Sequence, residues 1–401
     1  MKRITETLIM LLAATLISCS THKNVASDVI PTEAGMREQE IQASEYWGQL
    51  MVRVLDEEES TGNVCISPFS AQMAMSMTAA GATGSTQKEM YNAMRLYGDV
   101  NATSKELLEN INSGSNGCEV RSANSIWINE ELDTKESFIN SSKEFFNALV
   151  TRAPFNSSTL KRINSWCEEE TNGKIKSVLD KIGKNDRMYL INALYFKGAW
   201  DKKFSKSATD KKPFTTEDGK VVKVDMMHQT IRTGYFENED LQIVSKPFNG
   251  RYRMLFILPS AENSIADALI KLACNYDSCV STMSTYEVEL SLPKFRSEYS
   301  TSLKQPFMKM GVEKAFSGEA EFDGISGSPL YIDNVIQKTY INVDEEGAEA
   351  AAATLVSMAL TSFPRPVEKR IMNIDRPFIF MITDNTAKNI LFIGKVANPN
   401  E

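Results

Sequence analysis

"EEGAEAAAATLVSMALTSFPRP", residues 345–366, is the stretch of sequence on which the fold assignment depends, because its two halves favour different secondary structures. The first half is rich in glutamate and alanine, and such residues favour a helix by roughly a few tenths of a kcal/mol each. The second half, from Thr354, is β-branched and apolar and ends in Pro364 and Pro366. No single helical or strand period runs through the whole stretch. Its conformation therefore has to be inferred from the rest of the chain.

The composition is that of an ordinary globular protein, with 401 residues of which 42% are hydrophobic and 24% charged. A chain of this length can form one large domain or several smaller ones, and its core does not need disulfides for stability. The net charge of −8, with no block of lysine and arginine, argues against a nucleic-acid partner. No spacing typical of a metal site or a cofactor site is found, so we expect neither a metal nor a cofactor.

Five of the six cysteines follow residue 19, and an odd number cannot all pair within one chain. We interpret these five mainly as small buried apolar residues. Cys274 and Cys279 are close enough in sequence to form a bridge, and the sequence leaves that question open. The five are Cys65, Cys118, Cys167, Cys274 and Cys279.

The N-terminus has the features of a secretion signal. Lys2 and Arg3 precede an apolar run, residues 8–17, that is too short to span a membrane comfortably. The tetrapeptide Leu16-Ile17-Ser18-Cys19 resembles a bacterial lipobox. This resemblance implies cleavage before Cys19 and attachment of lipid to it. A plain secretory peptide with an incidental cysteine is the alternative.

We therefore expect a lipoprotein signal peptide over residues 1–18, a lipidated tether over 19–40 and a folded domain over 41–401. Several acyl chains on Cys19 would anchor the protein firmly to a membrane. The expected location is the bacterial cell envelope, where the protein would face either the periplasm or the exterior.

Helical periodicity dominates the first 190 residues and strand patterns dominate the remainder, without regular alternation of the two. This order predicts an α+β domain with mainly antiparallel sheets. Ser67 and Pro68 form an N-cap and first-turn pair. The helix that follows them is apolar almost all round, so we expect it inside a large core. Thr86 and Glu89 have the spacing of a capping box that opens a further helix.

The sequence offers little for an enzyme active site. Its two histidines are His22, in the tether, and His228. No nucleophile elbow, zinc-protease motif or phosphate-binding loop is present. A hydrolase would have to use His228, and because no motif surrounds this residue we interpret it as structural.

Several stretches together resemble the serpin family, in the family's order and over about residues 41–401. Three of them are specific on their own: "NALYFKGAW" (192–200), the Glu-Glu-Gly-Ala-Glu-Ala-Ala run (345–351) and "DRPFIF" (375–380). The other stretches are "NVCISPFS", "GATGSTQKEM", "INSWCEEETNGKI", "LSLPKF" and the remainder of residues 373–399.

The resemblance implies a serpin fold of the α+β class, with three mainly antiparallel β-sheets, eight or nine helices and an exposed reactive-centre loop near residues 347–366. It also implies suicide inhibition of serine endopeptidases, with cysteine endopeptidases as an alternative target. The protease cleaves the loop and forms a covalent acyl-enzyme. The loop then inserts as a new strand into the central sheet before deacylation, and the trapped protease is distorted. The protein would act as a monomer and would not be an enzyme.

This mechanism explains the mixed propensities of residues 345–366, because the segment must be stable both as an exposed loop and as a central strand. Gly347 suits a hinge, since it lacks a Cβ. Ala348 and its alternate neighbours would face the closed interior, where a charge would cost several kcal/mol, whereas Glu349 falls on the outward face. The full hinge comprises Glu346, Gly347, Ala348, Glu349, Ala350, Ala351, Ala352, Ala353 and Thr354.

The family's usual spacing, counted from Gly347, places the reactive bond between Thr361 and Ser362. Because the length of the loop varies within the family, nearby positions stay open. The alternatives are Met358, Ala359 and Leu360.

Phe363 and Arg365 would suit chymotrypsin-like and trypsin-like enzymes, but each precedes a proline. Most such proteases reject proline just after the scissile bond, and proline also fixes φ and lacks an N–H. We therefore expect no efficient cut at Arg365. The small and medium apolar residues of the loop point to an elastase-like, subtilisin-like or chymotrypsin-like target, with a papain-like cysteine protease as a further alternative.

The resemblance also implies a polar cluster under the point where the sheet opens, and its members here would be Ser67, Ser70, Asn192 and Gln337. The family commonly has a histidine at the position of Gln337. Glutamine can donate and accept hydrogen bonds but cannot titrate, so we expect no pH gate at this place. A non-inhibitory serpin that acts as a binding scaffold is the alternative function, and the small hinge residues favour an inhibitor.

Overall fold

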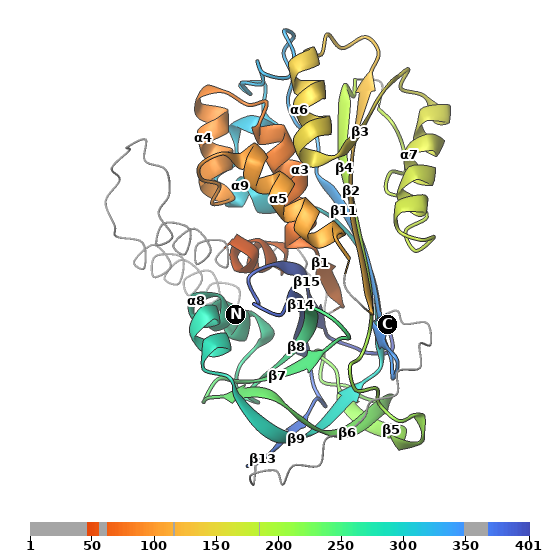
Figure 1. Ribbon diagram of the computed structural model, residues 1–401, viewed down its shortest axis with the longest axis vertical. Coiled ribbons are helices and arrows are strands. Elements are labelled where there is room, and N and C mark those ends of the chain that lie inside the picture. Colours follow the sequence, from red (N-terminus) through yellow and green to blue (C-terminus); the bar gives the residue numbers. More distant parts are fainter. Residues whose placement is uncertain (1–45, 56–61, 115–116, 184, 349–367) are drawn as a thin grey trace, which may run out of the picture. The chain divides into compact units, whose positions relative to one another are not determined.

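Two large β-sheets and the helices packed around them make up the structure. The computed structural model describes residues 46–55, 62–114, 117–183, 185–348 and 368–401 (Figure 1). These residues all fall within one compact unit, Glu38–Glu401. Among them, no helix combines the length and the hydrophobicity needed to cross a membrane.

The described helices begin with residues 46–55, and most of those that follow lie in the first half of the chain. Two short 3₁₀ helices, η1 and η2, occur later. The bounds are α3 Pro68–Ala79, α4 Gly84–Ala93, α5 Val100–Asn112, α6 Glu136–Phe146, α7 Ser157–Glu170, η1 Lys206–Ala208, α8 Ile265–Ser281, α9 Lys304–Lys309 and η2 Lys314–Phe316.

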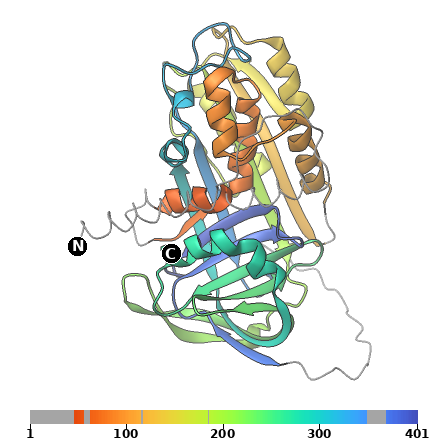
Figure 2. The ribbon, with the colours of Figure 1, turned by 90° about the vertical axis from the view of Figure 1, so that its left-hand side faces the viewer.

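The first sheet has nine strands in the order β1-β15-β14-β8-β7-β6-β9-β13, with β5 also paired to β6. All pairs are antiparallel except β13 with β9. In Figure 2 these strands gather in the lower half of the view. Their bounds are β1 Val64–Ile66, β5 Thr209–Thr215, β6 Val221–Glu237, β7 Leu241–Pro247, β8 Tyr252–Pro259, β9 Ser284–Pro293, β13 Lys369–Asn373, β14 Phe378–Asp384 and β15 Ile390–Val396.

The second sheet has six strands in the order β10-β11-β12-β4-β2-β3, and only β2 with β3 is a parallel pair of neighbours. Figure 1 shows α3, α5 and α6 on one side of β2 and β4, and α7 on the other. The bounds are β2 Cys118–Asn129, β3 Ala148–Ala153, β4 Met188–Ala199, β10 Phe295–Ser302, β11 Ile336–Val343 and β12 Gly347–Ala348.

The expected α+β class with mainly antiparallel sheets is confirmed, but the described strands form two hydrogen-bonded sheets rather than three. The reason is the length of β6, which has 17 residues. It pairs with β5 over one part of its length and with β9 and β7 over the rest. Strands that could have formed two separate sheets are thereby joined into one.

Helix α3 lies in the main core, as its apolar sequence predicts. Its N-cap Ser67 accepts a hydrogen bond from the backbone N–H of Ser70 at 3.0 Å, and Pro68 occupies the first turn. All of its residues except Gln72 are buried. On the opposite face of the six-stranded sheet, α7 contributes Ile163, Trp166 and Cys167 to a smaller apolar cluster.

The capping box expected from Thr86 and Glu89 is wrong. The helix begins earlier, at Gly84, and its first N–H groups are bonded by a carboxylate from far along the chain. Glu321 accepts from the N–H groups of Ser85 and Thr86 at 2.7 and 3.2 Å. Glu89 instead accepts from the N–H groups of residues 313 and 314. A tertiary contact therefore replaces the local cap.

The cysteine sites are largely as expected, since four of the five described cysteines are buried. Cys279 carries a free thiol, so it does not form the bridge to Cys274 that the sequence left open.

Candidate functional site

The segment that begins at Gly347 enters the six-stranded sheet between two long strands. Ala348 pairs with Val343 of β11 on one side and with Gly198 of β4 on the other. Its side chain is completely buried. Gly347 passes so close to β4 that an added Cβ would lie 2.0 Å from the carbonyl oxygen of Gly198. Residues 347 and 348 thus form a short strand, β12, between β11 and β4.

The residues before Gly347 are held by the chain that follows β4. The backbone N–H of Trp200 donates to the carbonyl oxygen of Glu346 at 3.0 Å, and that of Phe204 donates to Glu345 at 3.1 Å. The indole Nε1–H of Trp200 donates to the carbonyl oxygen of Asp344 at 2.9 Å. Residues 200–204 therefore anchor the hinge along its backbone.

Two glutamates fix the same hinge through their side chains. Glu345 is 5% exposed; its carboxylate lies 2.9 Å from Lys294 Nζ and accepts from Thr209 Oγ1 at 2.9 Å. Burial alone would raise the pKa of Glu345, but the hydrogen bonds from Lys294 and Thr209 outweigh it, so the pKa is lowered. The more exposed Glu346 lies 2.6 Å from Lys203 Nζ.

Replacing Glu345 with glutamine should lower the thermal midpoint of the intact protein at neutral pH. The change keeps the shape but removes a buried charge-assisted hydrogen bond, which contributes about 1.5–3 kcal/mol. Because the folded pKa of Glu345 is lowered, this stabilisation is present above the ordinary pKa range of glutamate and disappears as the pH falls through the folded pKa. Calorimetry of wild type and E345Q across acidic pH measures both effects.

The matched control is Glu346→Gln, whose ion pair is more open to water and should contribute less. An equal decrease of the thermal midpoint in the two variants would contradict the larger contribution expected of Glu345.

The four residues expected to form a polar cluster meet at the first turn of α3. The Gln337 amide binds the backbone of Ser67 twice: Oε1 accepts from its N–H at 2.8 Å and Nε2 donates to its carbonyl oxygen at 2.9 Å. Ser70 Oγ donates to Asn192 Oδ1. Since Gln337 is on β11 and Asn192 on β4, the helix end bridges the two strands between which Gly347 enters.

Sequence reasoning missed two members of this network, Ser122 and Asn124. Asn192 Nδ2 donates to Ser122 Oγ at 3.1 Å and to Asn124 Oδ1 at 2.8 Å. Both partners lie on β2, and both are buried. The available signal was two polar residues at alternate positions of a strand-like stretch, "RSANSIWIN", which places them on one face.

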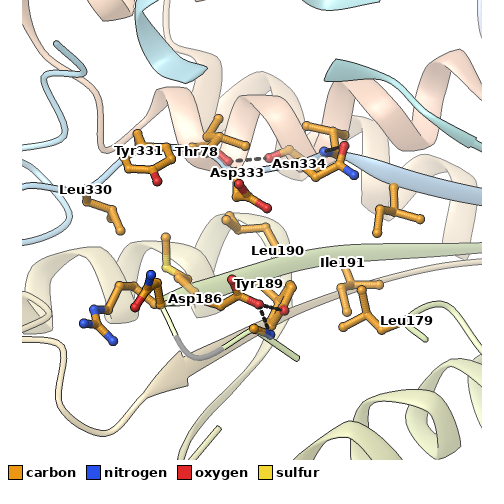
Figure 3. Close-up of a pocket in the computed structure, with 18 of the residues that line it drawn as sticks. Thr78, Leu179, Asp186, Tyr189, Leu190, Ile191, Leu330, Tyr331, Asp333 and Asn334 are labelled. Carbon is orange, nitrogen blue, oxygen red and sulfur yellow. Dashed lines mark hydrogen bonds between the residues drawn. The ribbon is translucent and has the colours of Figure 1, made fainter. Parts of the chain in front are cut away.

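A cavity of about 560 Å³ lies where β4 and β11 begin, at the opposite end of these strands from Gly347. Its walls include Leu190 and Ile191 of β4 and Val335 before β11, and Met75 of α3 also lines it. Figure 3 shows Asp186 and Tyr189 at this cavity, where the Tyr189 hydroxyl donates to the Asp186 carboxylate. The lining is thus mainly apolar, with polar groups among it.

The remaining expected site residues lie outside the described residues. They are Cys19, the hinge positions Glu349, Ala350, Ala351, Ala352, Ala353 and Thr354, and the reactive-bond candidates Met358, Ala359, Leu360, Thr361 and Ser362.

His228 lies on β6, in the nine-stranded sheet. Its Nδ1 is 2.9 Å from Ser291 Oγ and its Nε2 is 2.9 Å from Asp210 Oδ1. Asp210 is also paired with Lys212 at 2.8 Å. The residue types are those of a hydrolytic triad, but they lie across three neighbouring strands of an open sheet and do not line the cavity described above.

Comparison with known proteins identifies this arrangement. A family model described as "Serpin (serine protease inhibitor)" matches residues 43–399. The chain belongs to the serpin family. This serpin is 36% identical to a serpin-like protein of Thermococcus kodakarensis, over 85% of this chain and 82% of that protein. It is 32% identical to the leukocyte elastase inhibitor of Bos taurus, over 86% of this chain and 95% of the relative.

The solved structures agree with this assignment. The thermophilic serpin tengpin in its native state has a TM-score of 0.82 to this serpin and 30% sequence identity, covering 94% of this chain and 97% of that one. The expected serpin fold is confirmed. Serpins are protease inhibitors rather than enzymes, so the hydrolase hypothesis based on His228 has no support from the family.

Proposed function

We propose that this serpin is a suicide inhibitor of serine endopeptidases, and that its severed loop inserts between β11 and β4. The single observation that carries the proposal is that Ala348 is buried and is paired on both sides, at the C-terminal ends of these two strands. Each strand runs antiparallel to β12, so a chain that continues from Ala348 can pair with both. Among the described residues, only β12 separates β11 from β4 in the sheet order.

The register of β12 supports the proposed course of insertion. Thr354 is six positions after Ala348, and Asn192 and Gln337 are six positions before its partners Gly198 and Val343. A regular strand would therefore bring Thr354 between Asn192 and Gln337, where a hydroxyl can both donate and accept. The polar network at α3 would receive the polar residue that ends the alanine run.

The cavity supports the next step. Two and four positions beyond Thr354, Val356 and Met358 would face the same interior, opposite Leu190 and Met188 of β4. Both of these residues line the cavity. Burying a valine or methionine side chain contributes about 1.5–3 kcal/mol. Insertion would thus fill a space that the intact fold leaves between the two strands.

The same register is consistent with a reactive bond at Thr361–Ser362. Continuation of the strand brings Thr361 opposite Asn185, just beyond the start of β4 at Met188. Cleavage there leaves a chain that can follow the whole of β4, a distance of roughly 45 Å at the rise of a strand. A cut at one of the alternatives, Met358, Ala359 or Leu360, would leave a chain one to three residues shorter, which would still reach Met188 at the start of β4.

The proposed energetics require a metastable intact form. Each new strand hydrogen bond contributes about 1 kcal/mol net, so insertion of the loop is strongly downhill once the loop is cut. The intact fold would persist because its rearrangement is slow. The name of the Bos taurus relative supports an elastase-like enzyme as the first target to test, with subtilisin-like, chymotrypsin-like and papain-like enzymes as alternatives.

Incubation with a panel of serine and cysteine proteases tests this function. We expect a protease–serpin complex that resists SDS, and mass spectrometry of the released peptide should place the cut at Thr361–Ser362. A catalytically dead protease is the control, since it cannot form an acyl bond. Cleavage by every protease without any complex would contradict inhibition and favour the alternative, a non-inhibitory binding scaffold.

We also propose that Cys19 carries lipid and holds the serpin domain, residues 41–401, in a bacterial cell envelope through a tether over residues 19–40. The support is the lipobox-like sequence before Cys19. Metabolic labelling with a fatty acid should label the wild type but not Cys19→Ser. Labelling of both would contradict this proposal without affecting the inhibitory one.

A further inference from the structure

Lys246 of β7 is one of the most deeply buried charged residues among those described, with 1% of its surface exposed. Lysine is almost never fully buried without a partner of opposite charge. Here the nearest acceptors are uncharged: Nζ donates to the carbonyl oxygen of Lys202 at 2.5 Å and to Gln229 Oε1 at 2.5 Å. The two N–H groups of a neutral amine would match these two oxygens.

The contacts of Lys246 lead directly to the hinge. Its Nζ lies 4.4 Å from the ring centre of Phe204 and 5.4 Å from that of Trp200. The same two residues donate their backbone N–H groups to Glu345 and Glu346. Gln229 strengthens this connection, since its Nε2 donates to the carbonyl oxygen of Lys203 at 2.9 Å. Residues 200–204 are thus bonded to Lys246 and Gln229 and, through other atoms, to the hinge.

We propose that Lys246 is a positioning residue for loop insertion. In its neutral form it holds residues 200–204 against β6 and β7. Protonation releases these residues and loosens the hinge. The anchoring role follows from the contacts above. Its consequence for protease trapping rests on the inhibitory function proposed in the preceding subsection.

The surroundings of Lys246 determine when it changes charge. Burial lowers its pKa to about 7; Asp201 opposes this shift and Lys202 adds to it. From β6 and β8 the neighbouring side chains are Gln229 and Met254, which carry no charge. The change of charge therefore falls in the neutral range.

The direction of the effect follows from linkage. If residues 200–204 detach, water reaches the amine and its pKa returns toward that of ordinary lysine. Protonation therefore favours the detached state, and the anchorage is firmest above neutral pH. A loosened hinge delays the first step of insertion, so the acyl-enzyme has more time to hydrolyse. The ratio of trapped to merely cleaved product should fall severalfold between pH 8 and pH 6.

A titration of tryptophan fluorescence tests the proposal without any protease. Because Nζ lies beside the Trp200 ring, the wild type should show a transition with a midpoint near pH 7, which Lys246→Met should lack. Histidine as a residue type also titrates in this range, so His228→Ala is the control and should keep the transition. A transition that persists in K246M, or one that disappears in H228A, would overturn the assignment to Lys246.

The second measurement is the ratio of trapped to cleaved product for wild type and variant, with one protease at each pH, so that the protease's own pH dependence cancels. K246M should show a lower ratio than wild type, and this ratio should not change with pH. Lys246→Gln, which keeps a donor, should restore a higher ratio that is equally independent of pH. Parallel pH profiles for all three proteins would contradict the proposal. Absence of any complex with wild type would contradict the inhibitory function instead, while the fluorescence result would still decide the role of Lys246.

Discussion

Replacing Ala348 with arginine should abolish most protease trapping while the loop is still cleaved. Ala348 is fully buried between Val343 and Gly198, and a guanidinium there would have to leave water without a partner. If this raises the barrier to insertion by about 3 kcal/mol, insertion slows about 100-fold. The acyl-enzyme then hydrolyses first, and the inhibitor becomes a substrate. The measurement is the ratio of SDS-resistant complex to cleaved serpin.

Glu349→Arg is the matched control, because the next residue along a strand faces the opposite way. It adds the same side chain one position later and should keep trapping close to the wild-type level. Thermal unfolding of both intact variants checks that they are folded. Equal trapping by A348R and wild type would contradict insertion from this point.

Cleavage of the loop should raise the thermal midpoint of the protein by about 10–20 °C. A strand inserted between β11 and β4 adds on the order of ten hydrogen bonds at about 1 kcal/mol each, and for a domain of this size such a gain corresponds to a shift of that order. The cut can be made with a metalloprotease, which forms no acyl-enzyme and is not trapped. Calorimetry of the intact and cleaved forms gives the shift.

The same cleavage of A348R supplies the control, since its loop should insert poorly and its midpoint should rise much less. An unchanged midpoint in the cleaved wild type would mean that the loop does not enter the sheet. That result would contradict the proposed mechanism even if some protease were inhibited.

The sequence predicted those parts of the fold that depend on local patterns and on family motifs. The apolar run after Ser67 predicted a buried helix, and the order of helix and strand patterns predicted the α+β class. The hinge glycine was singled out because it lacks a side chain, and the structure places Gly347 where a Cβ would collide with Gly198. Such features are visible in a sequence because each depends on a few adjacent residues.

Features that depend on distant contacts could not be predicted. The cap of α4 comes from Glu321, which follows Ser85 by 236 residues. The spacing of Thr86 and Glu89 therefore predicted a local cap that the helix does not have. The number of sheets depended on which strands β6 would join. Lys246 sits in "LQIVSKPF", where a lysine in a run with strand propensity is a visible signal, but its partners Lys202 and Gln229 come from other elements.

The amide of Gln337 binds the main chain of residue 67 rather than its side chain. The two hydrogen bonds that join α3 to β11 should therefore be retained when residue 67 is substituted, except by proline, which lacks the N–H that Oε1 requires. The contact between α3 and β4 depends on the side chains of Ser70 and Asn192, so it does not tolerate substitution in the same way. We therefore expect residue 67 to vary more freely in evolution than Ser70 and Asn192.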